Sequence, residues 1–185
     1  MREVRDKRRG LRKRGIKRIG RFLEDYLIPV ILGPNNYHYI IDHHHLALAL
    51  LREGAGNVLV TVIADLSMLE PEQLWVVLDH HSWVQPYDED GRRVDVADIA
   101  KRVEQLKDDP FRSLAGELQR TGGCAKDMTP FSEFLWANFL RRRLGRRRVE
   151  KNFSVAAPGN EIGEDAIARY LPGWCGPADR RPPNG

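Results

Sequence analysis

The segment from Tyr39 to Leu51 constrains the fold more than any other part of the chain. It reads YIIDHHHLALALL: a short apolar run, one acid, three histidines and then an apolar stretch of helix-forming residues. This order predicts a strand, a polar turn and the start of a helix. The first turn of a helix offers unpaired backbone N–H groups and the positive end of the helix dipole, so this turn is suited to binding phosphate.

The segments around this turn predict a small sheet. Residues 29–32 and 37–41 read as two strands joined by the turn GPNN, which predicts a β-hairpin. A helix over residues 44–53 follows and ends at a Gly-Ala-Gly sequence. Residues 57–64 (NVLVTVIA) form the most β-rich stretch of the chain and predict a buried strand.

Helical patterns dominate the remaining sequence. Apolar residues at helical spacing predict helices over residues 1–26, 96–106 and 131–143, the last begun by Thr129 as cap and Pro130 in the first turn. The length suits one domain over residues 1–176, followed by a polar, proline-rich and disordered tail over residues 177–185. We therefore expect an α+β fold with a small mixed sheet and a mostly helical C-terminal half.

The basic residues are concentrated in two segments, although the net charge of the whole chain is only +4. Residues 1–21 carry 11 Lys or Arg against two acids, and Arg141 to Lys151 carry seven against one. Such segments can contact the phosphate backbone of DNA, although solvated helix faces give the same counts. Interleaved aromatic residues, which a platform for single-stranded nucleic acid needs, are missing from both segments.

Composition also bears on location. No apolar run approaches the ~20 residues needed to cross a bilayer, and no signal-peptide pattern follows the basic N-terminus. The two cysteines, Cys124 and Cys175, fit a reducing compartment. We expect a cytoplasmic protein that does not enter a membrane.

Five of the six histidines fall in two clusters, His43 to His45 and the pair His80 and His81. A turn could aim His43 and His45 at one zinc or iron ion, with Asp42 or the second cluster completing the site. Alternatively, the histidines of the turn have separate roles in the core, at a cap and in solvent.

The same turn resembles the phosphate-binding core of the ParB/sulfiredoxin superfamily, in which a motif such as Asp-Gly-His-His-Arg stands between strand and helix. Within that superfamily the chain is similar to the ParB-like putative nuclease family. The similarity extends to Trp174 and rests on IDHHHLALALL, on LKDDPFRSLAG, on residues 126–143 and on LPGW. Two positions depart from the motif: His43 replaces the glycine and Leu46 replaces the arginine. Related proteins also begin with a strand upstream of the segment that matches Met1.

The resemblance implies a small mixed sheet of ParB/sulfiredoxin type and a nucleotide or phosphorylated small molecule at the turn. The nucleotide would be ATP, ADP or CTP, with Mg²⁺. His43, His44 and His45 would contact phosphate, and Asp42 would orient an imidazole or a Mg²⁺-bound water. The implied activity is that of a nuclease or a kinase-like enzyme, and the alternative is a non-catalytic DNA-associated module that uses the two basic segments.

A second candidate group lies in the C-terminal half. Glu133 stands in the first turn of the 131–143 helix on an otherwise aromatic face, where a carboxylate could act as a base. Lys126 and Arg112 could contact phosphate, and Cys124 follows two glycines as a reactive thiol could. Alternatively, Glu133 complements the helix dipole and Arg112 pairs with Asp108 or Asp109.

Overall fold

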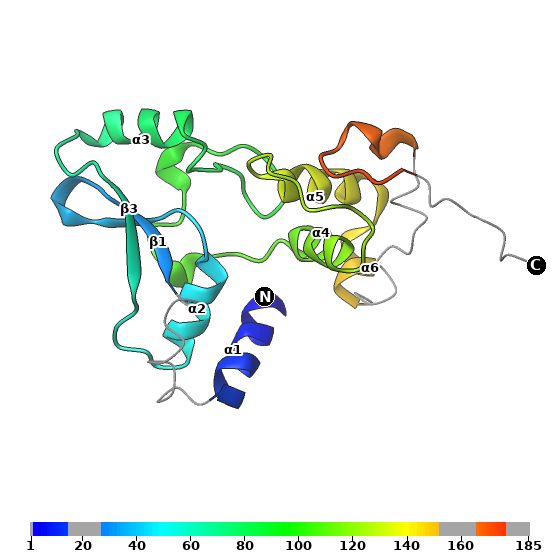
Figure 1. Ribbon diagram of the computed structural model, residues 1–185, viewed down its shortest axis with the longest axis horizontal. Coiled ribbons are helices and arrows are strands. Elements are labelled where there is room, and N and C mark those ends of the chain that lie inside the picture. The colour runs from blue at the N-terminus through cyan, green and yellow to red at the C-terminus, as the bar shows by residue number, and fades with distance from the viewer. Residues whose placement is uncertain (1, 15–26, 152–165, 177–185) are drawn as a thin grey trace, which may run out of the picture. The chain divides into compact units, whose positions relative to one another are not determined.

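The computed structural model describes residues 2–14, 27–151 and 166–176 (Figure 1). The chain divides into two compact units, residues 1–108 and residues 109–185. Within the described residues, the first unit contains a three-stranded sheet and three α-helices, and the second contains three further α-helices. The predicted α+β class with a helical C-terminal half is confirmed. The single domain over residues 1–176 stays a prediction, and the tail lies outside the described residues.

The sheet is mixed, as the sequence predicts. Strand β1 (Ile28–Leu32) pairs antiparallel with β2 (His38–Ile40) through the short turn η3 (Pro34–Asn36), which confirms the hairpin. On its other side β1 pairs in parallel with β3 (Val60–Asp65), which gives the order β2-β1-β3. Because β1 is the central strand, its apolar side chains are fully buried at Ile28, Val30 and Ile31.

Helix α2 (His44–Arg52) lies between β2 and β3 in the chain and supplies most of one hydrophobic core. Its residues 46–50, LALAL, are all buried, so the apolar run predicts the buried face correctly. Helix α1 (Arg2–Arg14) packs against α2 and adds Val4 and Leu11 to the same core. The second half of the predicted N-terminal helix, residues 15–26, lies outside the described residues.

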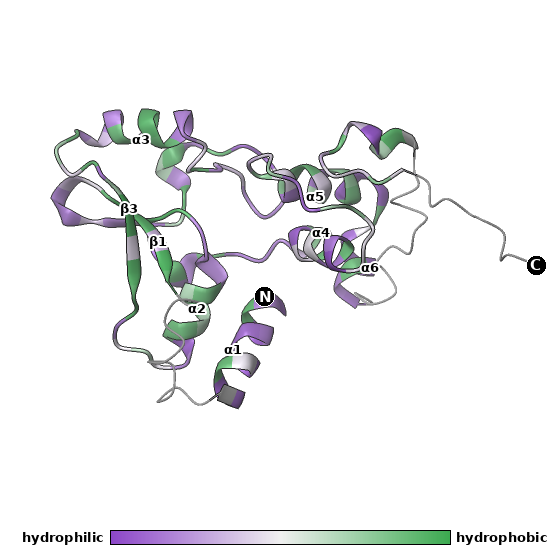
Figure 2. Cartoon of the chain, in the orientation of Figure 1, coloured by the Kyte–Doolittle hydropathy of each residue, from purple (hydrophilic) through white to green (hydrophobic). Residues whose placement is uncertain are grey.

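Strand β3 differs from its prediction, because the sequence predicts a buried strand and the structure exposes it. Five of its six residues are exposed, and Ile63 reaches 49%. The reason is topological: β3 is an edge strand of the described sheet, and of its residues only Ala64 packs against a core cluster, one formed around Ile31 and Leu74. Figure 2 shows apolar residues along β1 and β3 alike, so hydropathy could not separate the two environments.

Helix α3 (Pro71–His80) follows β3 and begins with reciprocal caps between Glu70 and Gln73. The helix predicted over residues 96–106 is wrong. Two single 3₁₀ turns stand there, η4 (Val96–Asp98) and η5 (Val103–Gln105). Ile99 adopts an extended backbone, and the Gln105 side chain accepts the backbone N–H groups of residues 101 and 102, so local side-chain bonds replace the helix.

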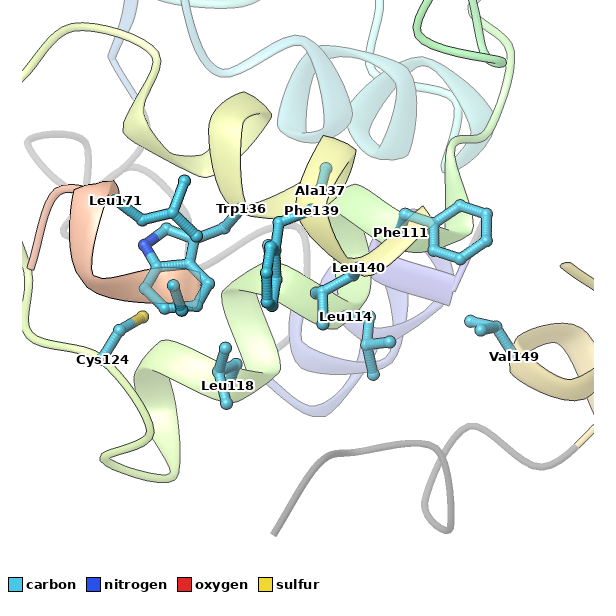
Figure 3. Close-up of a cluster of buried hydrophobic side chains, with 12 residues drawn as sticks. Phe111, Leu114, Leu118, Cys124, Trp136, Ala137, Phe139, Leu140, Val149 and Leu171 are labelled. Atoms are coloured by element: carbon cyan, nitrogen blue, oxygen red, sulfur yellow. The ribbon is translucent and has the colours of Figure 1, made fainter. Parts of the chain in front are cut away.

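The second unit is built on α4 (Pro110–Arg120), α5 (Ser132–Arg143) and α6 (Arg146–Lys151), with a 3₁₀ helix η6 (Ala166–Tyr170). Its core joins these four elements and the Cys124 loop, as Figure 3 shows; its buried members include Phe111, Leu114, Leu118, Trp136, Phe139, Leu140, Val149 and Leu171. Helix α5 begins one residue later than the predicted start at residue 131. Phe131 takes the cap position in the left-handed region at φ 58°.

None of the helices in the described segments combines the length and apolar character needed to span a membrane.

Two glycines of the second unit should respond in opposite ways to alanine. Gly116 lies inside α4, where an added Cβ would have no atom within 4 Å, whereas a Cβ on Gly173, at φ +71°, would stand 2.1 Å from the Ala125 carbonyl oxygen. We expect Gly116→Ala to raise the free energy of unfolding by about 0.5–1 kcal/mol and Gly173→Ala to lower it by about 2 kcal/mol or more. Urea unfolding followed by tryptophan fluorescence measures both, and equal effects would contradict the backbone assignment at Gly173.

Candidate functional site: the Asp42–His45 turn

The turn between β2 and α2 is closed by side chains of its own residues. The Asp42 Oδ1 atom accepts the backbone N–H of His43 at 2.6 Å. His43 Nδ1 donates to the Leu27 carbonyl oxygen at 2.9 Å, which joins the turn to the residue before β1. This bond places the ring proton on Nδ1 and leaves Nε2 as the other ring nitrogen of His43.

His43 adopts the left-handed conformation, with φ 60° and ψ 25°. This region favours glycine, and among other residues it is rare outside Asn, Asp and His. The ParB/sulfiredoxin motif has glycine at this position, and the left-handed backbone explains why glycine suits it. His43 adopts the same backbone conformation. The backbone turn is kept, and an imidazole is added at its exposed corner.

His43, the left-handed residue, immediately precedes the first residue of α2. No side chain caps the helix at His43, and the first helical bond runs from the Ala47 N–H to the His43 carbonyl oxygen. The start of α2 therefore presents backbone donors and the positive end of its dipole without a carboxylate cap from the N-cap residue.

The two histidines inside the first turn of α2 are both half-buried. His45 Nδ1 lies 2.8 Å from Glu3 Oε2 of α1, which leaves Nε2 as its second ring nitrogen. Leu46, which stands where the motif has arginine, is 5% exposed and packs in the core. A guanidinium contact from that position is therefore absent, and the backbone N–H groups are the donors at the start of α2. Because Nδ1 of His43 and Nδ1 of His45 already face acceptors, these rings can donate from Nε2 only when they carry both protons.

Helix α1 is fixed on α2 at the opposite end by an ionic clamp. Glu53, whose side chain is 7% exposed, accepts from Arg12 Nε at 2.8 Å and from Arg8 Nε at 2.5 Å. The hydrogen bonds from Arg12 and then Arg8 hold the pKa of Glu53 below its ordinary value. Because Glu3 and the clamp residues lie more than forty positions from their partners, no local sequence signal could have revealed these contacts.

The second predicted group lies in the second unit. Arg112 and Glu133 form an ion pair, and the Arg112 guanidinium carbon stands 3.9 Å from the Phe134 ring centre. Lys126 is exposed and has no ion pair with the described residues. The structure thus brings Arg112 and Glu133 together, and Lys126 does not pair with either of them.

Arg112 pairs with Glu133, and Asp109, one of the two acids expected to pair with Arg112, has other partners. Asp109 Oδ1 caps α4 by accepting the Phe111 N–H at 2.9 Å, and Asp109 Oδ2 accepts from Arg141 at 2.5 Å. Arg141, expected to contact DNA, is therefore engaged inside the second unit.

The structure does not join the two histidine clusters. Across the described ranges, no three His, Cys, Asp or Glu side chains converge on a position that could hold a metal ion. His81 instead stacks on Trp83 with ring centres 4.4 Å apart. Cys124 is buried in the core of the second unit, and this burial raises its pKa to about 11, so its thiol is not activated for nucleophilic attack.

The mixed β2-β1-β3 sheet and the helix that follows the acid-histidine turn are consistent with a ParB-like fold, and the comparisons support this class. A family model described as "Putative ParB-like nuclease" matches residues 1–142, and the chain belongs to this family. The crystal structure of protein Atu1540 from Agrobacterium tumefaciens is similar at 44% identity with a TM-score of 0.85; the match covers 95% of this chain and 88% of that one. A search of curated proteins found no match.

The clamp on α1 should make stability depend on pH. Because the pKa of Glu53 is lowered in the folded protein, its ionised form contributes stability above the ordinary glutamate pKa of about 4.3, and this contribution is lost as the pH falls through the lowered value. We expect Glu53→Gln to lower the free energy of unfolding at pH 7 and to have a smaller effect at about pH 3, where the glutamate of the unfolded chain is protonated. Denaturant unfolding at both pH values measures the difference.

Glu104→Gln is the matched control, because Glu104 is exposed and forms no ion pair with the described residues. A pH-independent effect of Glu53→Gln, or an equal effect of the control, would contradict the clamp.

Proposed function

We propose that the Asp42–His45 turn binds a phosphate group of a nucleotide or a phosphorylated small molecule. The observation that carries this proposal is the start of α2, where a left-handed His43 leads into a helix without a side-chain cap. Backbone donors, a helix dipole and imidazole nitrogens then meet at one corner, and this combination suits a phosphate.

The groups proposed to contact the phosphate are of two kinds, backbone N–H groups and imidazole rings. The N–H groups of the first turn of α2 lie beside the rings of His44 and His45, and the rings supply nitrogens in place of the arginine that Leu46 replaces. Glu3 acts as a positioning residue, because its contact with Nδ1 orients the His45 ring. In this proposal the ring carries both protons, so that Nε2 can donate to the phosphate.

The reaction class we propose is phosphoester chemistry, as in a nuclease or a phosphotransferase. The family description supports this class. Asp42 is the carboxylate of the turn, so it is the residue that would hold Mg²⁺, which would supply positive charge to stabilise a phosphate. In this proposal Asp42 would orient a Mg²⁺-bound water at the turn. Glu133, paired with Arg112, is a separate candidate base within the second unit.

Calorimetric titration with ATP, ADP and CTP in the presence of Mg²⁺ tests the turn. We expect a dissociation constant in the range of about 1–100 µM for at least one nucleotide, weakened about tenfold or more by the double variant His44→Ala/His45→Ala. The rings are only half-buried, so the variant should fold.

The chain offers a matched control in its other histidine pair. His80→Ala/His81→Ala removes two neighbouring imidazoles at the end of α3 and should leave affinity unchanged. Absence of binding by the folded wild-type protein, or an equal loss in both double variants, would refute the proposal.

A second candidate function, DNA association, is favoured by the end of the second unit. Arg142, Arg147, Arg148 and Lys151 are exposed and form no ion pair with the described residues. Five of the eight cations of α1 are instead engaged with acids: Arg2 and Arg9 with Asp6, Lys7 with Glu3, and Arg8 and Arg12 with Glu53. The exposed cations of α5 and α6 are therefore the better candidates for phosphate-backbone contacts.

Salt dependence distinguishes this function from binding at the turn. If Arg147 and Arg148 each neutralise one phosphate of duplex DNA, Arg147→Gln/Arg148→Gln should reduce the slope of log K against log salt by about 2. Fluorescence anisotropy over a salt series measures the slope. Arg92→Gln/Arg93→Gln, an exposed pair in the first unit, is the control; an unchanged slope in the first variant would exclude these contacts.

A further inference from the structure

The two cysteines of the chain lie in the second unit, and both are free thiols. Cys124 is 3% exposed and belongs to the hydrophobic core that also contains Trp136 and Leu171 (Figure 3). Cys175, four residues after Leu171, is exposed. One compact unit therefore contains a thiol that solvent molecules can reach and a thiol that they cannot.

The backbone brings the two cysteines to one carbonyl group. The Gly173 carbonyl oxygen accepts the backbone N–H of Ala125 at 2.7 Å, and the Cys175 thiol donates to the same oxygen with its sulfur 3.5 Å away. Because Cys124 is covalently bonded to Ala125, both cysteines stand beside this oxygen. Burial raises the pKa of Cys124, and the nearby Cys175 thiol adds to the rise, which agrees with their proximity.

The segment that carries Cys175 is held against the Cys124 loop on both sides of Gly173. Trp136 Nε1 donates to the Pro172 carbonyl oxygen at 2.8 Å, and Leu171 is buried in the core. At Gly173 itself, a Cβ would stand 2.1 Å from the Ala125 carbonyl oxygen, so glycine is the residue that permits this close approach. The cysteines are therefore neighbours because of the way the second unit folds.

We propose that Cys124 and Cys175 are a site of reversible oxidation, at which they form a disulfide with each other when the protein meets a low-molecular-weight disulfide such as oxidised glutathione. A disulfide needs its two Cα atoms within about 7 Å, and segments that share a backbone hydrogen bond favour such a spacing. In a reducing compartment such bonds are mostly transient and respond to oxidants.

The exposed Cys175 reacts first, because the oxidant can reach it. Its thiolate attacks one sulfur of oxidised glutathione, breaks that disulfide and releases one glutathione thiolate. Cys124 then loses its proton and attacks the Cys175 sulfur of the mixed disulfide, and the second glutathione leaves as a thiol. Two cysteine thiols are oxidised, and one glutathione disulfide is reduced to two thiols. Proximity drives the second step, because the buried Cys124 is by itself a poor nucleophile.

Intact-mass spectrometry of the reduced full chain after incubation with oxidised glutathione tests both steps. We expect the wild-type protein to lose two hydrogen atoms and to keep no glutathione, and dithiothreitol should restore its reduced mass. Cys124→Ala should keep one glutathione on Cys175, because no second thiol displaces it. Cys175→Ser should stay unmodified, because Cys124 is buried. Far-UV circular dichroism checks that both variants fold.

The redox equilibrium distinguishes a pair that the fold holds together from two thiols that meet at random. In mixtures of reduced and oxidised glutathione, we expect the equilibrium constant for the Cys124–Cys175 disulfide to be about tenfold or more higher in the folded protein than in about 8 M urea. By linkage, the oxidised wild-type protein should then unfold at a higher urea concentration than the reduced protein. Cys175→Ser is the matched control, and its unfolding should not respond to the oxidant.

The proposal is overturned if the folded wild-type protein retains glutathione on Cys175, if neither cysteine reacts, or if the disulfide forms between two chains. It is also overturned if the equilibrium constant is no higher in the folded protein than in urea. None of these outcomes depends on the ligand proposed for the Asp42–His45 turn.

Discussion

The parallel pairing of β1 with β3 is the constraint on which the first unit depends. Parallel neighbours cannot be joined by a tight turn, so the chain between them must travel away from the sheet and return. It does so through β2 and α2, whose residues 46–50 are buried in the core. The start of α2 is thereby placed beside the residue preceding β1, and a hydrogen bond from His43 to Leu27 joins the Asp42–His45 turn to that residue.

Ion pairs between α1 and α2 also position side chains at the Asp42–His45 turn. Glu53 fixes α1 against the end of α2 through Arg8 and Arg12, and the same docking brings Glu3 to His45 near the start of α2. An acidic residue beside a proposed phosphate position weakens its positive potential, so the contribution of Glu3 is orientation rather than attraction. The ionic clamp and the proposed binding turn are thus two ends of one helix pair.

The candidate turn is predictable from the sequence, whereas the residues that surround it are not. The acid, the three histidines and the start of α2 are local features, and the structure places them as the pattern predicts. Glu3 and the Arg141–Asp109 pair come from distant positions, so no spacing rule could connect them. The helix expected over residues 96–106 failed because the Gln105 side chain competes for backbone donors, an effect that apolar periodicity does not report.

The sequence by itself determined the element types near the turn, the buried face of α2 and the family resemblance that the comparisons confirmed, because these depend on neighbouring residues. Only the tertiary structure decided which strand is central and which is an edge. The apolar runs of β1 and β3 are equivalent in hydropathy, yet Val30 is buried and Val62 is exposed. Strand order is set by long-range pairing and by what covers each face, and neither is encoded in the composition of a single strand.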